Sequence, residues 1–219
     1  MIRQMARAVI AAVVILLLSL ILVVSSQFLT QSRAGAFLAQ ANSLRVGMST
    51  FDVAKKLEAI YHGHELTGGM YRPDCSPRDC YIQFLFTNKW LARLRLAPPT
   101  GFATTLHIEN GLIISRTTAY AAEAGKHSFT LAVDESSSPG YIQDLCAVFF
   151  RTDLSGRPWK IQISISPKAS QLQRDLVYSF DLSCLTGLGS CGEPTRILPA
   201  LSQKDILICS ERRLPVARQ

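Results

Sequence analysis

Hydrophobic residues near the N-terminus form one uninterrupted run. Ala8 to Val24 holds 17 residues with no charge and a single hydroxyl, on Ser19, and extension to Leu29 gives 22 residues. Because an α-helix rises 1.5 Å per residue, about 20 apolar residues cross the ~30 Å hydrocarbon core of a bilayer. The pattern therefore predicts a transmembrane anchor over residues 1–29 and a single folded domain over residues 30–219.

Basic residues flank this run unequally. Arg3 and Arg7 precede it, and the next basic side chain is that of Arg33. Positive residues favour the cytosolic side of a span. We therefore expect a single-pass protein with a cytosolic N-terminus. Residues 30–219 would then lie outside the cytosol, in the periplasm if the cell has two membranes.

A cleaved signal peptide is the alternative interpretation of the run. Signal peptides usually have an apolar region of about 7–15 residues that ends at small residues. Val24-Ser25-Ser26 and Ala39-Gln40-Ala41 are acceptable cleavage contexts. The greater length of the run favours an uncleaved anchor. No cysteine precedes Cys75, so lipidation at the export site is not expected.

Periodic patterns then predict helices and strands in residues 30–219. The first is a helix from about Thr50 to Tyr61, capped by Ser49. Its apolar residues recur at i, i+4 and i+7 and share one face: Val53, Leu57 and Ile60.

Short segments with β-branched and aromatic residues predict strands. They are Tyr81–Phe86, Phe102–Ile108, Leu112–Ser115, Ser128–Val133 and Trp159–Ser166. Asn110-Gly111 predicts a two-residue hairpin turn, because both central positions of a type I′ turn need positive φ. Ala119–Lys126, rich in Ala and Gly, is expected to be a connector.

The last of these strands has the clearest alternation. Its apolar and polar positions are Trp159, Ile161, Ile163 and Ile165 against Lys160, Gln162, Ser164 and Ser166. One apolar and one polar face are typical of an antiparallel sheet that is solvated on one side. A helix capped by Ser166 should follow, with Pro167 at its first position. The expected fold class is α+β, with helices packed on an antiparallel, disulfide-bonded β-sheet.

Six cysteines in an exported chain predict disulfides. They are Cys75, Cys80, Cys146, Cys184, Cys191 and Cys209. Local pairing of Cys75 with Cys80 and of Cys184 with Cys191 is the simplest of 15 connectivities, and Cys146 with Cys209 follows by elimination. A zinc site formed by His62, His64, Cys75 and Cys80 is the alternative, which an oxidising compartment disfavours.

Charge and motifs predict no catalytic residue and no cofactor. The net charge of +7 is mild and spread along the chain. Gly187–Gly192 matches G-x-G-x-x-G but lacks the strand before it and the helix after it that a dinucleotide site needs. His107 and Glu109 share a strand face, for which a surface pair is the favoured interpretation.

A basic and aromatic cluster follows the first predicted strand. It consists of Lys89, Trp90, Arg93 and Arg95. Such a cluster can bind nucleic acid or lipid headgroups. Nucleic acid is not an expected partner outside the cytosol, and arginines that extend from a structural element are the simpler interpretation.

A short motif resembles a known family. Leu44-x-x-Gly47-Met48-Ser49, followed by Val53 and Leu57, is similar to the opening helix of small outer-membrane assembly lipoproteins of the BamE (SmpA/OmlA) type. The chain differs from them in its length and in lacking a lipidated cysteine, so their function is not transferred. Its C-terminal part resembles uncharacterised membrane-anchored bacterial proteins.

These patterns favour a non-catalytic, membrane-anchored extracytoplasmic protein. Its partners would be the membrane, through the N-terminal helix, and another envelope protein. Its role would be interaction or envelope maintenance. An envelope hydrolase or ligand-binding enzyme is the alternative. A deep pocket lined by His62, His64 and acidic residues would favour that alternative, whereas a flat apolar surface would favour the interaction role.

Overall fold

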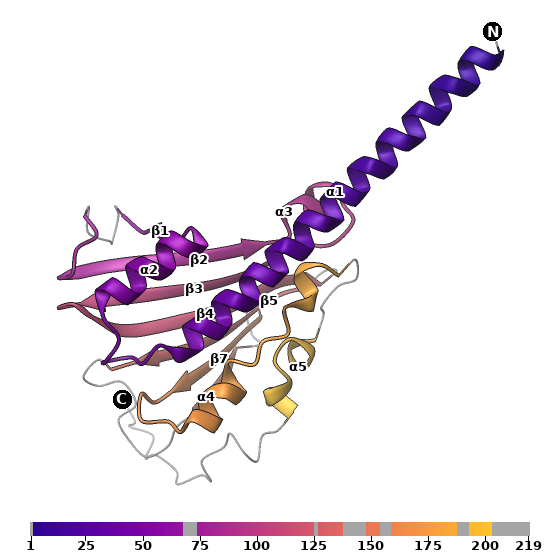
Figure 1. Ribbon diagram of the computed structural model, residues 1–219. Coiled ribbons are helices and arrows are strands. Elements are labelled where there is room, and N and C mark those ends of the chain that lie inside the picture. Colours follow the sequence, from indigo (N-terminus) through magenta and orange to yellow (C-terminus); the bar gives the residue numbers. More distant parts are fainter. Residues whose placement is uncertain are drawn as a thin grey trace.

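The computed structural model describes residues 2–67, 74–124, 127–137, 148–153, 159–187 and 193–202. Its first element, α1 (Ile2–Ser43), is one helix whose N-terminal half projects from the rest of the chain as a rod (Figure 1). Large apolar side chains from Met5 to Leu22 are exposed along this rod. By length and composition α1 can cross a membrane, with a mean hydropathy of 3.2 in its apolar part.

Seven strands of the described residues form one mixed sheet in the order β1-β2-β3-β4-β5-β7-β6. Neighbouring strands are antiparallel except β5 and β7, which run parallel. The strands are β1 (His64–Glu65), β2 (Asp79–Thr87), β3 (Thr100–Glu109), β4 (Leu112–Ala124), β5 (His127–Ser136), β6 (Val148–Asp153) and β7 (Trp159–Ile165).

Short helices precede, connect or follow these strands. They are α2 (Phe51–Tyr61), α3 (Lys89–Arg93), α4 (Gln171–Val177) and α5 (Pro194–Ile197), with 3₁₀ turns η1 (Leu182–Leu185) and η2 (Pro199–Ser202). The chain is therefore α+β, as the sequence predicted.

One face of the sheet carries the apolar core. In β3, buried residues alternate with half-buried ones along most of the strand. The C-terminal half of α1 contributes Ala34, Phe37, Leu38 and Ala41 to the same cluster. The Phe37 ring lies 4.5 Å from that of Phe84 in β2 and 5.3 Å from that of Tyr61 in α2, measured between centroids. One helix thus joins the exposed apolar rod to the core of the domain.

Several local predictions are confirmed. The helix expected from about Thr50 to Tyr61 is α2. Asn110 and Gly111 both have positive φ, 53° and 79°, in the hairpin between β3 and β4. Ile163 and Ile165 of β7 are fully buried, while Lys160 is exposed.

Other predictions are wrong in detail. The sheet is mixed, because β7 pairs with β5 in parallel. Alternation shows which face is solvated but not the direction of the neighbouring strand. The expected connector Ala119–Lys126 largely belongs to β4, where Ala119 and Ala122 pair with residues of both neighbouring strands. Sheet pairing there overrides the low strand propensity of alanine.

Both predicted helix caps are displaced. Thr50 is the N-cap of α2, and the Ser49 hydroxyl accepts a hydrogen bond from the Arg45 amide at 2.8 Å. Ser170, not Ser166, caps α4 in a capping box with Gln173. The predicted face of α2 is shifted as well, since Ala54 is buried where Val53 was expected.

The disulfide prediction is met at one pair. Cys75 and Cys80 are bonded to each other, so their sulfurs do not act as thiolate ligands for zinc. Cys184 is also disulfide-bonded. Cys146, Cys191 and Cys209 lie outside the described residues, as does most of the Gly187–Gly192 motif.

Candidate functional site

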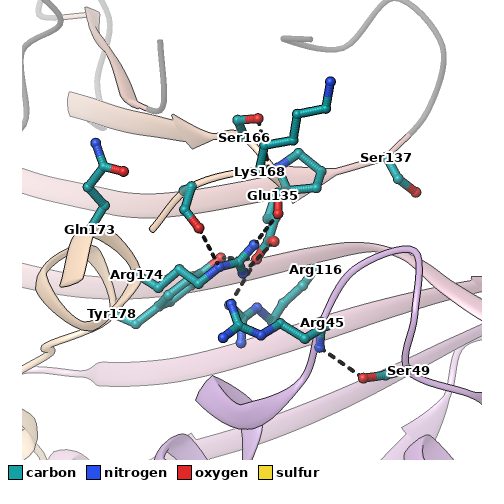
Figure 2. A network of polar contacts seen from close by, with 12 residues as sticks. Arg45, Ser49, Arg116, Glu135, Ser137, Ser166, Lys168, Gln173, Arg174 and Tyr178 are labelled. Atoms are coloured by element: carbon teal, nitrogen blue, oxygen red, sulfur yellow. Dashed lines mark hydrogen bonds and ion pairs between the residues drawn. The ribbon is translucent and has the colours of Figure 1, made fainter. Parts of the chain in front are cut away.

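A cluster of charged side chains lies inside the domain, between the sheet and the helices (Figure 2). Arg116 of β4 and Glu135 of β5 are directly paired across the two strands, and their charged atoms are 2.9 Å apart. Arg174 of α4 approaches the same carboxylate from the other side, at 2.6 Å. All three side chains are at most 1 % exposed. Glu135 is thus held between two guanidinium groups.

Backbone carbonyls complete the cluster. Arg116 donates to the carbonyl of Ala41, in the last turn of α1. Arg174 donates to the carbonyls of Pro167, at 2.6 Å, and Ala169, at 3.3 Å. The Ala41 carbonyl also accepts from the Leu44 amide at 3.1 Å. Carbonyls in the last turn of a helix carry the negative end of its dipole, so a guanidinium there is favourably placed. The cluster therefore attaches the end of α1 to the sheet and to the segment before α4.

An aromatic ring covers the excess positive charge. The guanidinium carbon of Arg116 lies 3.8 Å from the centre of the Tyr178 ring, a cation–π contact. The Tyr178 hydroxyl lies 3.4 Å from Glu135. Burial is the main cause that raises the pKa of Tyr178, which keeps the phenol neutral. With all three charged side chains enclosed, the cluster has the geometry of a structural clamp rather than a reactive centre.

A shallow groove of about 560 Å³ runs between α1 and the segment that follows α4. Its lining is aromatic, aliphatic, hydroxyl and amide in character, without an acid, a histidine or a cysteine. The lining residues are Phe28, Gln31, Ser32, Gly35, Leu38, Ala39, Asn42, Tyr178, Ser179, Phe180 and Leu182. Such a surface can bind an apolar or amide-bearing partner, but it offers no general acid–base pair.

The histidines considered in the sequence do not converge. His62 and His64 are both exposed, and His62 is the left-handed C-cap of α2. His107 stacks on Tyr81, with ring centroids 3.9 Å apart, and its Nε2 atom lies 3.2 Å from Asp79. The partner of His107 is therefore Asp79 on the neighbouring strand, not Glu109 on its own strand.

The buried cluster was not predicted from the sequence. Arg116 and Glu135 lie on separate strands, and Arg174 lies on a helix far along the chain. No local motif joins them. One available signal was the placement of both strand residues in phase with apolar neighbours, such as Tyr120 and Val133.

Comparison with known proteins finds no match. No family model, no curated protein and no solved structure matches this chain. The resemblance to BamE-type lipoproteins stays a prediction, and the function must be argued from the geometry.

Proposed function

We propose that this chain is a membrane-anchored, extracytoplasmic interaction or envelope-maintenance protein without catalytic activity. The observation that carries the proposal is the division of α1 into two halves. Large apolar side chains from Met5 to Leu22 are exposed, whereas buried side chains begin at Gln27 and include the completely buried Phe37. An exposed apolar half needs a bilayer, and the buried half fixes the domain to it.

Charge and redox chemistry support the extracytoplasmic side. Arg3 and Arg7 precede the apolar run, which favours a cytosolic N-terminus. The disulfide between Cys75 and Cys80 agrees with an oxidising compartment.

The chemistry of the groove supports interaction rather than catalysis. A catalytic pocket normally brings together titratable groups whose environments differ. The groove beside α1 instead presents Phe28, Leu38 and Phe180 together with amide groups. The open lining suits a protein segment with apolar side chains and backbone amides.

A fusion experiment tests the topology. Alkaline phosphatase fused after Gln219 should be active, whereas a fluorescent protein that folds only in the cytosol should stay dark at the same position. The opposite result would contradict both the orientation and the oxidising compartment.

A crosslinking experiment tests the interaction role. A photoreactive amino acid at Ser32 or Ala39 in the groove should give a discrete crosslinked protein in intact cells, and the same group at exposed Ala59 of α2 should not. Equal labelling from all three positions, or none, would argue against the groove as a docking site.

A further inference from the structure

A short turn lies at the end of the domain where α1 leaves it. Residues 88–97 follow β2 and contain α3, which lies beside α1 (Figure 1) and contacts it. The turn contains no acidic residue. Its exposed side chains are three basic and three apolar ones: Lys89, Arg93 and Arg95, and Trp90, Leu94 and Leu96. We call residues 89–96 the basic–aromatic turn.

A buried side chain and buried hydrogen bonds fix the backbone of the turn. Leu91 is 1 % exposed and packs inward. The buried Asn88 side chain donates to the Pro98 carbonyl at 2.8 Å and accepts from the Thr100 amide at 2.9 Å. Arg95 adopts a left-handed backbone, with φ of 57°. These contacts fix the backbone from which the exposed side chains of Trp90, Leu94 and Leu96 project. Their exposure to water is unfavourable, because burial of apolar side chains normally lowers the free energy.

The turn lies close to the end of the apolar rod. On α1, Val23 and Val24 are half-buried, and Gln27 is the first fully buried residue, at 2 % exposure. The apolar run ends at Val24, and its extension ends at Leu29. The domain therefore begins to contact α1 at the depth where a spanning helix leaves the hydrocarbon core.

We infer that the basic–aromatic turn is a second membrane contact, which inserts Trp90, Leu94 and Leu96 into the headgroup region of the extracytoplasmic leaflet. This inference rests on the proposed anchoring through α1. Tryptophan is enriched at bilayer interfaces, where its ring suits the headgroup level. Lys89, Arg93 and Arg95 bind anionic phospholipid headgroups from the same turn, with their aliphatic stems along the interface.

The geometry of Trp90 and Arg93 fits this partner. The guanidinium carbon of Arg93 lies 5.9 Å from the centre of the Trp90 ring, within cation–π range. A lipid phosphate can pair with the open side of this guanidinium while the indole remains at the headgroup level. Two attachments, α1 and the turn, fix the rotation of the domain about the helix axis as well as its height.

Depth-dependent fluorescence quenching tests the inference on the full-length chain. The protein has two tryptophans, so Trp159→Phe leaves Trp90 as the reporter. The variant is reconstituted into phosphatidylcholine–phosphatidylglycerol vesicles whose acyl chains are brominated near the headgroup. We expect blue-shifted Trp90 emission and loss of at least half of its intensity relative to unbrominated vesicles.

Two further probes separate the inference from the anchoring on which it rests. Both use the Trp90→Phe, Trp159→Phe background. Leu16→Trp, in the middle of the apolar run, should be quenched by lipids brominated deep in the acyl chain, and Met48→Trp, beyond the far end of α1, should not be quenched. Quenching at position 16 without quenching of Trp90 would overturn the membrane contact alone. Absence of quenching both at position 16 and at Trp90 would overturn the anchoring itself.

Charge variants test the lipid chemistry. Lys89→Gln, Arg93→Gln and Arg95→Asn remove the three charges, and asparagine tolerates the left-handed backbone at position 95. We expect phosphatidylglycerol in the vesicles to increase the quenching of Trp90. This triple variant should not show that increase. The matched control, Lys56→Gln, Lys160→Gln and Lys168→Gln at exposed sites, should retain it. The same response in both variants would overturn the role of the basic side chains.

Discussion

At the scale of single residues, the stability of the domain depends on charged side chains that are buried away from water. Arg116, Glu135 and Arg174 are each at most 1 % exposed. Desolvation of such ions costs several kcal/mol each, and only close partners and further hydrogen bonds offset it. Glu135 contacts both guanidiniums. It is therefore the side chain whose loss leaves the most uncompensated charge.

Glu135→Gln should accordingly destabilise the protein. Removal of one partner from a buried ion pair typically costs about 3–5 kcal/mol, because the remaining charge stays buried. Asp134→Asn is the matched control on the adjacent residue, whose half-buried carboxylate accepts from Gln162, and should cost about 1 kcal/mol. Urea unfolding of detergent-solubilised protein measures both. Similar losses for the two variants would contradict the clamp.

For Tyr120 we expect that removal of a polar group does not lower the free energy of unfolding. Among the residues that the structure describes, nothing forms a hydrogen bond with its buried hydroxyl. Because an unsatisfied buried hydroxyl is costly, Tyr120→Phe should leave the free energy of unfolding at neutral pH unchanged or raise it by about 1 kcal/mol. Thermal melts of the two proteins in the same detergent measure the difference.

The same residue predicts alkaline behaviour. Burial first, and the nearby Asp181 carboxylate second, raise the pKa of Tyr120. The unfolded chain loses this phenol proton near pH 10 while the folded chain keeps it, so stability falls as pH rises above about 10. Tyr120→Phe should make that fall shallower, and the remaining slope should come in part from Tyr178, whose pKa burial also raises. An unchanged slope would show that Tyr120 titrates normally.

Local sequence patterns could not predict these buried contacts between distant residues. Arg116 and Glu135 lie in phase with apolar residues on their strands, but a charged residue on a strand is more often solvated than buried. The cation–π contact of Arg116 with Tyr178 and its hydrogen bond to the Ala41 carbonyl form only after three distant segments meet. The pair Cys75 and Cys80 was predictable because a short turn brings the two residues together without tertiary information.

At the scale of elements, α1 has two environments along one helix. Phe37 is fully buried among aromatic rings, whereas Phe28 is 60 % exposed. Phe37→Ala should therefore cost about 3–5 kcal/mol of unfolding free energy. Phe28→Ala, the same change nine residues earlier, should stay within about 1 kcal/mol. Equal effects, measured by urea unfolding in detergent, would show that the C-terminal half of α1 does not pack as described.

The strand β7 gives a second element-scale prediction. Ile163 is fully buried on the core face, and Lys160 is exposed at the start of the strand. Ile163→Ala should cost about 2–5 kcal/mol, and Lys160→Ala should stay within about 0.5 kcal/mol. Gln162 is a poorer control, because it donates to Asp134 on β5. Small effects at both positions in the same unfolding assay would refute the assignment of the core face.

Elements were predictable where one local rule dominates. The turn at Asn110 and Gly111 follows from their tolerance of positive φ. The strand β4 was predicted too short, because Ala119 and Ala122 gain their strand conformation from β3 and β5 on either side. The parallel pairing of β7 was not predictable, because alternation in one strand says nothing about the direction of its neighbour.

At the scale of the whole molecule, the point where α1 enters the domain determines which N-terminal residues can be removed without loss of the core. Side chains before Val23 are exposed where described, and Gln27 is the first fully buried one. Cleavage at Val24-Ser25-Ser26 would spare the core. Cleavage at Ala39-Gln40-Ala41 would remove Ala34, Phe37 and Leu38 from it. The second cleavage context is therefore incompatible with this fold.

Two truncations test that boundary. A chain that begins at Ser26 should be soluble without detergent and should unfold cooperatively, since the described side chains that it loses are exposed apart from two half-buried valines. A chain that begins at Gln40 lacks Phe37 and Leu38, whose truncation to alanine alone would cost roughly 5–10 kcal/mol together. That loss is comparable with the whole stability of a typical domain, so the shorter chain should be unfolded by circular dichroism. A peptide of residues 26–39 should restore its fold when added, because the ring contacts of Phe37 return with it. If the Gln40 chain folds unaided, the second half of α1 is an accessory to the domain, and the division of α1 no longer supports rigid anchoring.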